Sequence, residues 1–191
     1  MLIDDDRDLA KRASRGDLVA FELLVERHQA RLTTLAGRLL GSHADAADAV
    51  QETLVRAWLA LPRFRGDARF STWLTRICLN AVHDQRERRG ALADAAAPEA
   101  IDLRDGFAAS ELSGELQRAL AALDDSFREA VVLYDLLGCS YLEVATLTGV
   151  AEGTVKSRIY RGRAELARLL SASGGAGDAG PGTSPGEAAS K

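Results

Sequence analysis

Apolar side chains recur with the period of an α-helix between residues 44 and 61, and this periodicity is the strongest constraint on the fold of the chain. At about 100° per residue, one side of such a helix collects Ala47, Val50, Leu54, Ala57, Trp58 and Leu61. No segment of useful length has the alternation of apolar and polar residues that predicts a β-strand. The sequence therefore predicts an all-α fold.

The opposite side of this helix is acidic, and it presents Asp45, Asp48, Glu52 and finally Arg56. Packing of the apolar core does not explain why these carboxylates align. They could therefore form a docking face for a basic helix of a partner protein. The other interpretation is a solvated outer face, which is the usual case for an amphipathic helix. Spacing alone favours the solvated face.

Residues 62–70 interrupt the helical pattern. Because Pro62 and Gly66 break helices, the segment from Phe64 to Phe70 is predicted as a loop. It exposes two aromatic rings among three arginines, Arg63, Arg65 and Arg69. Rings among guanidinium groups suit unpaired nucleic-acid bases, since each base has a face for stacking and each nucleotide has a phosphate to neutralise. The alternative is that Phe64, Phe70 and Trp73 are core residues under the loop.

The next helix is expected to follow Ser71 or Thr72, either of which can cap its N-terminus. Its apolar side collects Trp73, Leu74, Ile77, Cys78 and Ala81. Its polar side collects Arg76, Asn80, His83 and Glu87. On that side Asn80 and His83 could reach base edges. The place of Trp73 in the apolar stripe favours a core role for its ring.

A helix-turn-helix is predicted near the C-terminus. Residues 142–148 form a short helix, Gly149 permits a sharp turn, and Glu152 or Thr154 opens a longer helix. The buried side of the longer helix is expected to hold Val155, Ile159, Gly162, Leu166 and Leu169. Its outer side holds Lys156, Ser157, Tyr160, Arg161 and Arg168, a set that fits a DNA major groove or a merely solvated face.

These segments resemble the conserved regions of bacterial extracytoplasmic-function (ECF) sigma factors. The first match spans about residues 21–89 and is carried by residues 45–52, 56–58, 64–67, 72–77 and Asn80. The second match covers residues 140–161. The resemblance implies two small helical domains joined by a flexible linker. It also implies a sigma subunit that binds core RNA polymerase, recognises promoters and melts DNA, with a role in stress response.

The resemblance also assigns roles to residues. Docking on the polymerase falls to Asp45, Asp48, Gln51, Glu52 and Arg56. Recognition and melting of the −10 element fall to Phe64, Arg65, Asp67, Phe70, Ser71, Thr72, Trp73, Arg76 and Asn80. Reading of the −35 element falls to Lys156, Ser157, Arg158, Tyr160 and Arg161. The implied partners are core RNA polymerase, through its β′ clamp helices and β flap, promoter DNA, and an anti-sigma factor.

Composition shifts suggest the domain boundaries. Residues 1–90 are expected to form the first helical domain, 91–108 an acidic linker, 109–170 the helix-turn-helix domain, and 171–191 a disordered tail rich in Gly, Ala, Ser and Pro. The net charge is −4, whereas basic residues predominate in the segments 63–89 and 156–168. An acidic chain with basic faces predicts DNA binding that depends on a partner, because the overall field repels phosphate.

No catalytic, metal or cofactor motif is apparent in the sequence, so neither enzyme activity nor a cofactor is expected. His43 with Asp45 and Asp48 is too open a set for a metal site. Cys78 and Cys139 lie far apart and are expected to be reduced structural thiols. The acidic start is no signal peptide, and no apolar run approaches the ~20 residues of a membrane span, so a cytoplasmic protein without membrane insertion is expected.

Two alternatives belong to other functional classes. A stand-alone helix-turn-helix regulator that binds duplex DNA without polymerase accounts for the C-terminal half only. A pure interaction module, such as an anti-sigma decoy, leaves the loop of rings and arginines unexplained.

Overall fold

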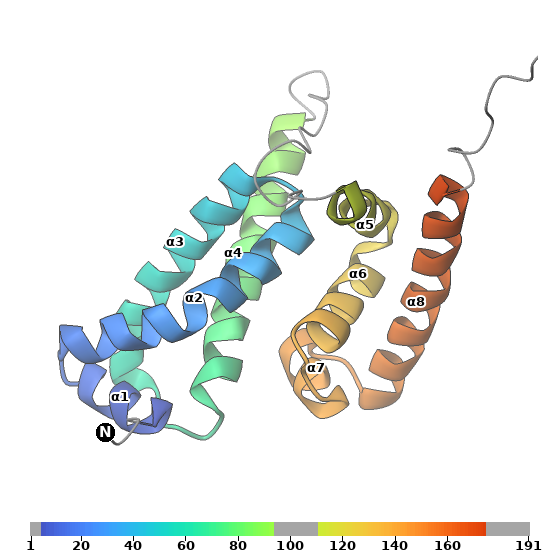
Figure 1. The fold of residues 1–191 in the computed structure, drawn as a ribbon. Helices are drawn as coiled ribbons and strands as arrows, with labels where there is room; N and C mark the ends of the chain where they lie inside the picture. Colours follow the sequence, from blue (N-terminus) through green and yellow to red (C-terminus); the bar gives the residue numbers. More distant parts are fainter. Residues whose placement is uncertain (1–4, 94–110, 175–191) are drawn as a thin grey trace, which may run out of the picture.

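A computed structural model describes residues 5–93 and 111–174 of the 191-residue chain. In these ranges the backbone forms eight α-helices and no strand, which confirms the predicted all-α class (Figure 1). The helices are α1 (Asp6–Ala13), α2 (Leu18–Leu40), α3 (His43–Ala60), α4 (Phe70–Ala93), α5 (Glu111–Ala122), α6 (Asp125–Val131), α7 (Tyr141–Thr148) and α8 (Glu152–Gly174). Most of the expected linker and tail lies outside the described residues.

The N-terminal group consists of α1 to α4. Helices α2, α3 and α4 pack against one another, and α1 packs near the start of α2 (Figure 1). Asp17 caps α2 by accepting a hydrogen bond from the Ala20 amide at 3.0 Å, and Gly41 ends the helix with a φ of 72°. The buried core contains Leu9, Leu24, Leu35, Leu39, Ala57, Leu61, Leu79 and Val82.

The C-terminal group consists of α5 to α8. A π-helical segment, η2 (Val132–Leu136), continues α6. A capping box in which Ser140 and Glu143 bond reciprocally starts α7, and Gly149 ends it with a φ of 71°. The predicted helix-turn-helix is confirmed, because α8 follows at Glu152 and buries Val155 and Ile159 as its periodicity indicates.

The two groups contact each other directly. Helix α2 meets α5 and η2, and α4 meets α7. Several contacts between the groups are polar: Arg31 donates from Nη1 to the Leu137 carbonyl at 2.6 Å, and Arg38 donates from Nη1 to Gln117 Oε1 at 3.2 Å. The side chain of Gln117 is buried at this contact. The described C-terminal group is therefore placed against α2 and α4 by specific hydrogen bonds.

Candidate functional site

The acidic face of α3 borders a shallow groove beside α4. The groove has a volume of about 280 Å³ and includes Asp48, Gln51, Glu52, Val55, Ala81 and Arg88 in its lining. Asp48 and Gln51 are exposed. The buried side of α3 holds Ala46 and Ala49, whereas Ala47 is exposed, so the predicted apolar stripe was wrong at that residue. Among the described residues, the groove is open to solvent.

Two members of the predicted docking set form cross-helix contacts instead of facing freely outward. Asp45 Oδ2 lies 2.6 Å from Arg89 Nη1, and Asp45 Oδ1 accepts from Gln85 Nε2 at 3.2 Å. Arg56 lies between Asp84 at 2.6 Å and Glu52 at 2.7 Å, and the hydrogen bonds with these carboxylates raise its pKa. Both residues tie α3 to α4 and so fix the wall of the groove.

The loop between α3 and α4 contains an aromatic cluster. The ring centroid of Phe64 lies 5.8 Å from that of Phe70 and 4.9 Å from that of Trp73. Phe70 is only 4% exposed, so the expectation of two exposed rings was wrong for Phe70 and the core alternative applies to it. Phe64 is half-buried, while Arg65 and Asp67 are exposed. Gly66 turns the loop with a φ of 77°.

Helix α4 begins at Phe70, two or three residues before the expected start. Ser71 and Thr72 therefore lie in its first turn, and neither is the residue before the helix. Both are half-buried, as is Trp73, which packs on the core as its place in the apolar stripe predicts. The polar face that follows on α4 carries Arg76 and Asn80, both exposed.

This polar face of α4 is turned toward the C-terminal group. Arg76 donates from Nη2 to the Thr146 carbonyl at 2.6 Å, and Thr72 Oγ1 lies 3.5 Å from Glu143 Oε1. Asn80 lines a cleft of about 740 Å³ together with His83 on its own helix and Arg158 on α8. Residues that the resemblance assigns to the −10 element thus face α7 and the cleft beside it.

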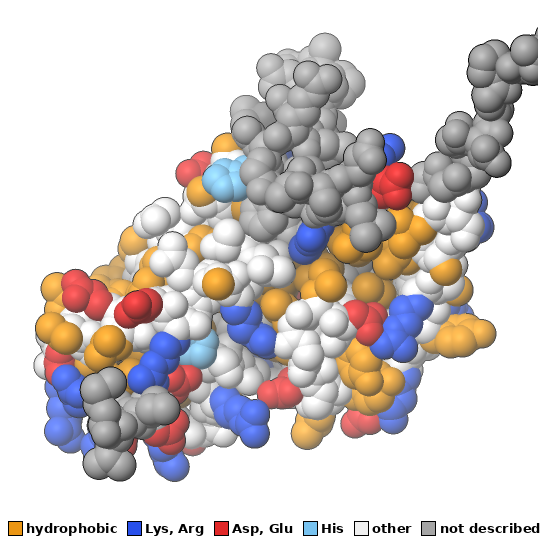
Figure 2. All heavy atoms as spheres, in the orientation of Figure 1, with side chains coloured by type: hydrophobic (Ala, Val, Ile, Leu, Met, Phe, Trp, Pro, Cys, Tyr) orange, Lys and Arg blue, Asp and Glu red, His pale blue; other side chains and the backbone are white. Residues whose placement is uncertain are grey.

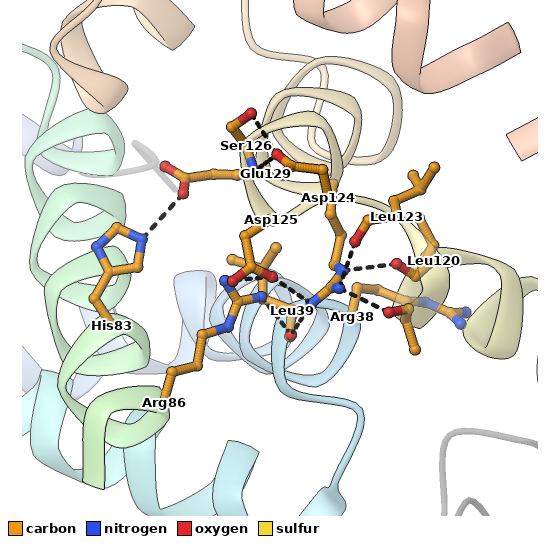
Figure 3. A network of polar contacts seen from close by, with 12 residues as sticks. Arg38, Leu39, His83, Arg86, Leu120, Leu123, Asp124, Asp125, Ser126 and Glu129 are labelled. Carbon is orange, nitrogen blue, oxygen red and sulfur yellow. Dashed lines mark hydrogen bonds and ion pairs between the residues drawn. The ribbon is translucent and has the colours of Figure 1, made fainter. Parts of the chain in front are cut away.

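A polar network joins α4, α2 and α6 (Figure 3). Arg86 donates from Nη2 to the Leu39 carbonyl at 2.6 Å, and Arg128 Nη1 reaches the same oxygen at 3.4 Å. Arg128 also donates to the carbonyl of Leu120 at 2.6 Å, and burial lowers its pKa. Asp125 lies between the two arginines, at 3.4 Å and 3.0 Å. Sequence reasoning missed this network, because carbonyl acceptors leave no signal in a pattern of residue types.

The outer face of α8 is open to solvent at four of the five predicted −35 residues, namely Lys156, Ser157, Tyr160 and Arg161. Tyr160 is 76% exposed, so its ring is accessible from solvent. Lys156 pairs with Glu152 at 2.8 Å, and this hydrogen bond raises the pKa of the lysine. Arg158 differs, because it is half-buried and lines the cleft beside α4.

The two cysteines, Cys78 and Cys139, are both buried and form no disulfide. Cys78 is fully buried, and burial raises its pKa to about 11. Cys139 is also buried, and its Sγ accepts a hydrogen bond from Arg31 Nη2 at 3.3 Å. Within the described residues no group of His, Cys, Asp and Glu side chains could hold a metal ion. Among the helices of those residues, none is both long and apolar enough to span a bilayer.

Two family models match the chain. Residues 24–91 match Sigma-70 region 2, and residues 113–166 match Sigma-70 region 4. The chain is 41% identical over 165 residues to the ECF RNA polymerase sigma factor SigM of Mycobacterium tuberculosis H37Rv, covering 86% of this chain and 84% of that protein. It is 38% identical over 173 residues to the ECF RNA polymerase sigma-E factor of Escherichia coli K12, covering 83% and 90% respectively.

Solved structures give the same picture. The structure of CnrH in complex with the cytosolic domain of CnrY is similar with a TM-score of 0.70 and 37% identity, covering 88% of this chain and 99% of that one. The sigma factor RpoE of Bartonella quintana, solved with the anti-sigma factor NepR, is similar with a TM-score of 0.70 and 30% identity, covering 79% and 96%.

Proposed function

The chain belongs to the extracytoplasmic-function sigma factor family of RNA polymerase. We propose which of its surfaces bind the polymerase and which bind promoter DNA. As a sigma subunit, it binds core RNA polymerase and directs promoter recognition and DNA melting at initiation. The observation that carries this conclusion is that both halves of the chain match sigma regions. A stand-alone helix-turn-helix regulator would not account for the match of residues 24–91 to Sigma-70 region 2.

We assign polymerase docking to the groove between α3 and α4. Asp48, Gln51 and Glu52 present oxygen atoms there beside the apolar side chain of Val55. A basic helix of the polymerase, such as the β′ clamp helices that the resemblance implies, is complementary in charge to this wall. Asp45 and Arg56 act on the groove through the ion pairs that fix α3 on α4.

Capture of the melted −10 strand is assigned to the loop and to the start of α4. The half-buried ring of Phe64 offers a stacking surface, and Arg65 and Arg69 are exposed for phosphates. The rings of Phe70 and Trp73 both contact the ring of Phe64 and so hold it in position. Asp67, Ser71, Thr72, Arg76 and Asn80 would complete the surface that the strand follows. Because Thr72 and Arg76 bond to α7, their part would require the C-terminal group to move away from α4.

Reading of the −35 element is assigned to the outer face of α8. Lys156, Ser157, Tyr160 and Arg161 are exposed together and supply donors, a ring and charge to a major groove. Arg158 is part of the family pattern but lies half-buried at the cleft. Its contribution to the −35 element would therefore require the C-terminal group to move away from α4.

Two further partners follow from the family. An anti-sigma factor is proposed because the related RpoE was solved with such an inhibitor. The β flap of the polymerase is proposed to meet the C-terminal group. Because all of these roles take place on chromosomal DNA, we place the protein in the cytoplasm. It acts by binding, and the reaction chemistry belongs to the polymerase.

The test is transcription with purified components. Core polymerase with the full-length chain should give defined run-off products from genomic fragments, whereas core polymerase alone should not. Mapping the 5′ ends identifies the promoters. A gel shift on those promoters should require core polymerase, and tight binding by the chain alone as a dimer would instead support the stand-alone regulator.

A further inference from the structure

A cavity lies between α1 and the loop that precedes α4. Its volume is about 580 Å³, within the range of sites for small organic groups. The loop side supplies Phe64 and residues 66–69, followed by Phe70 and Ser71 at the start of α4. The other side is formed by Asp5, Asp6 and Arg7 at the start of α1. The family resemblance assigns nothing to this end of α1.

The start of α1 is held in place by Asp6. Its Oδ1 accepts a hydrogen bond from Arg27 Nη1 at 3.1 Å, and its Oδ2 lies 2.7 Å from His28 Nε2. Both partners belong to α2. Farther along α1, Leu9 and Ala10 are buried in the core. The wall of the cavity is therefore a fixed part of the fold.

The same contact reaches the aromatic cluster. The ring of His28 lies 5.5 Å from the ring of Phe70, which in turn contacts Phe64 and Trp73. A continuous chain of contacts thus runs from the Asp6 carboxylate through His28 to the rings of the loop. A change at Asp6 should therefore shift the rings through His28.

Arg7 lies opposite the sharpest turn of the loop. Its Nε would be 4.0 Å from a Cβ placed on Gly66, whose φ is 77°. The side chain of Arg7 lines the cavity together with Arg69 from the loop side. Phe64 lines the same cavity, and so do the carboxylates of Asp5, Asp6 and Asp67. A ring beside two guanidinium groups matches one unpaired nucleotide, whose base can stack while its phosphate is neutralised, and the carboxylates can accept hydrogen bonds from the donors on a base edge. Figure 2 shows basic and acidic side chains intermixed over the end of the molecule where Figure 1 places α1.

We propose that α1 forms the second wall of the pocket that captures one nucleotide of the melted −10 strand, with Arg7 contacting its phosphate and Asp6 acting as a positioning residue. This inference rests on the proposed capture of the strand by the loop. It adds α1, which neither the motif pattern nor the matched region 24–91 includes.

The test uses holoenzyme made from core polymerase and the full-length chain, with promoter DNA that is already unpaired over the −10 element. Single abasic sites are placed along the non-template strand, and the position at which the wild type loses most affinity marks the captured base. Arg7→Ala should weaken binding about fivefold or more and reduce the slope of log K against log salt by about 0.7, the value for one phosphate on a single strand. Arg12→Ala is the matched control, because Arg12 lies on the same helix but pairs with Asp17 and does not line the cavity.

Asp6→Asn should weaken binding about fivefold on intact DNA and should have little effect at the abasic position, where no base depends on the aligned rings. A loss of equal size at the abasic position would show that Asp6 acts on folding alone and would overturn its positioning role. If Arg7→Ala matches Arg12→Ala in affinity and salt slope, α1 is not a wall of the site. If the wild type itself shows no preference for any base in the unpaired strand, the proposed function of the loop fails instead.

Discussion

His83 on α4 and Glu129 on α6 form an ion pair between the two helical groups, with Nε2 of the ring 3.0 Å from the carboxylate Oε2. The hydrogen bond with Glu129 raises the pKa of His83 above its ordinary value near 6.5, although burial and the charge of Arg86 act in the opposite direction. Asp125 faces the same ring and favours its charged form. The pair is thus a titratable link in the contact between the groups.

We expect the stability of this contact to depend on pH. A raised pKa in the folded state means that the stabilisation is complete below about pH 6.5 and is lost as the pH rises through the raised pKa. Because 44% of the His83 side chain is exposed, the contribution is at most about 1 kcal/mol. Urea unfolding of wild type and His83→Gln between pH 5.5 and 8.5 should give free energies that differ in acid and converge in base, and a constant difference would contradict the assignment.

Arg86 should contribute more to stability than the similar Arg88, two residues further along α4. Arg86→Ala removes the 2.6 Å hydrogen bond to the Leu39 carbonyl and leaves that oxygen with the longer contact from Arg128. Loss of a charged donor to a part-buried acceptor costs about 1–3 kcal/mol. Arg88 is exposed and bonds locally to Gln85 at 3.3 Å, so Arg88→Ala should stay within about ±0.5 kcal/mol. Equal unfolding midpoints for the two variants would show that the network adds little.

These contacts mark the limit of prediction from sequence. The helices α3, α4 and α8 follow from apolar periodicity, and the turn at Gly149 follows from the freedom of glycine at positive φ. Which residues of α4 face another part of the chain does not follow, because Arg76 and Arg86 bond to carbonyl groups that every residue possesses. The choice between an exposed and a buried Phe70 stayed open for a related reason.

The start of α4 illustrates that reason. Two loop phenylalanines have the same local signal in the sequence, yet Phe70 is buried against His28 of α2 while Phe64 stays half-buried. The difference depends on His28, a residue more than 40 positions away along the chain. Residue types near the loop therefore predict an aromatic–arginine surface, and tertiary packing decides which ring a ligand can reach.

Gly162 allows α8 to pack closely on α6. A Cβ at this position would lie 2.7 Å from Val131 Cγ2 and 3.3 Å from the Phe127 carbonyl oxygen. Overpacking of this kind costs about 1–3 kcal/mol, which exceeds the gain of about 1 kcal/mol in helix propensity. Gly162→Ala should therefore lower or leave unchanged the free energy of unfolding. Gly153→Ala on the same helix meets no atom within 4 Å and should be neutral or stabilising in the same urea titration. A stabilised Gly162→Ala would contradict this packing.

Charge reversal at Asp48 tests the docking groove. Asp48 is exposed, so Asp48→Lys should leave the helical circular dichroism unchanged and weaken binding to core polymerase by several-fold or more. Glu26→Lys on α2 is the matched control, because it makes the same change of charge at an exposed position outside the groove. Competition against wild type for a limiting amount of core polymerase measures the difference. If Asp48→Lys competes as well as Glu26→Lys, docking occurs elsewhere.

Alanine variants on the outer face of α8 should distinguish a side chain that reads a base from one that contacts a phosphate. Arg161 is exposed, and Val155 and Ile159 are buried on the other side of the helix, so Arg161→Ala should change stability by no more than about ±0.5 kcal/mol. If Arg161 reads a base edge, its loss costs about 1–3 kcal/mol at the preferred site and flattens discrimination at one or two positions. Lys156→Ala should instead weaken all sequences alike and reduce the log–log salt slope by about one, because a lysine on a phosphate carries no sequence information.

Arg158→Ala provides the internal comparison, since its half-buried side chain lies at the cleft and its loss should change the sequence preference less than the loss of Arg161. Binding of holoenzyme to a library randomised over the −35 element, at two salt concentrations, measures all three variants. A preference profile and salt slope that stay at wild-type values in both Arg161→Ala and Lys156→Ala would remove α8 from the −35 element.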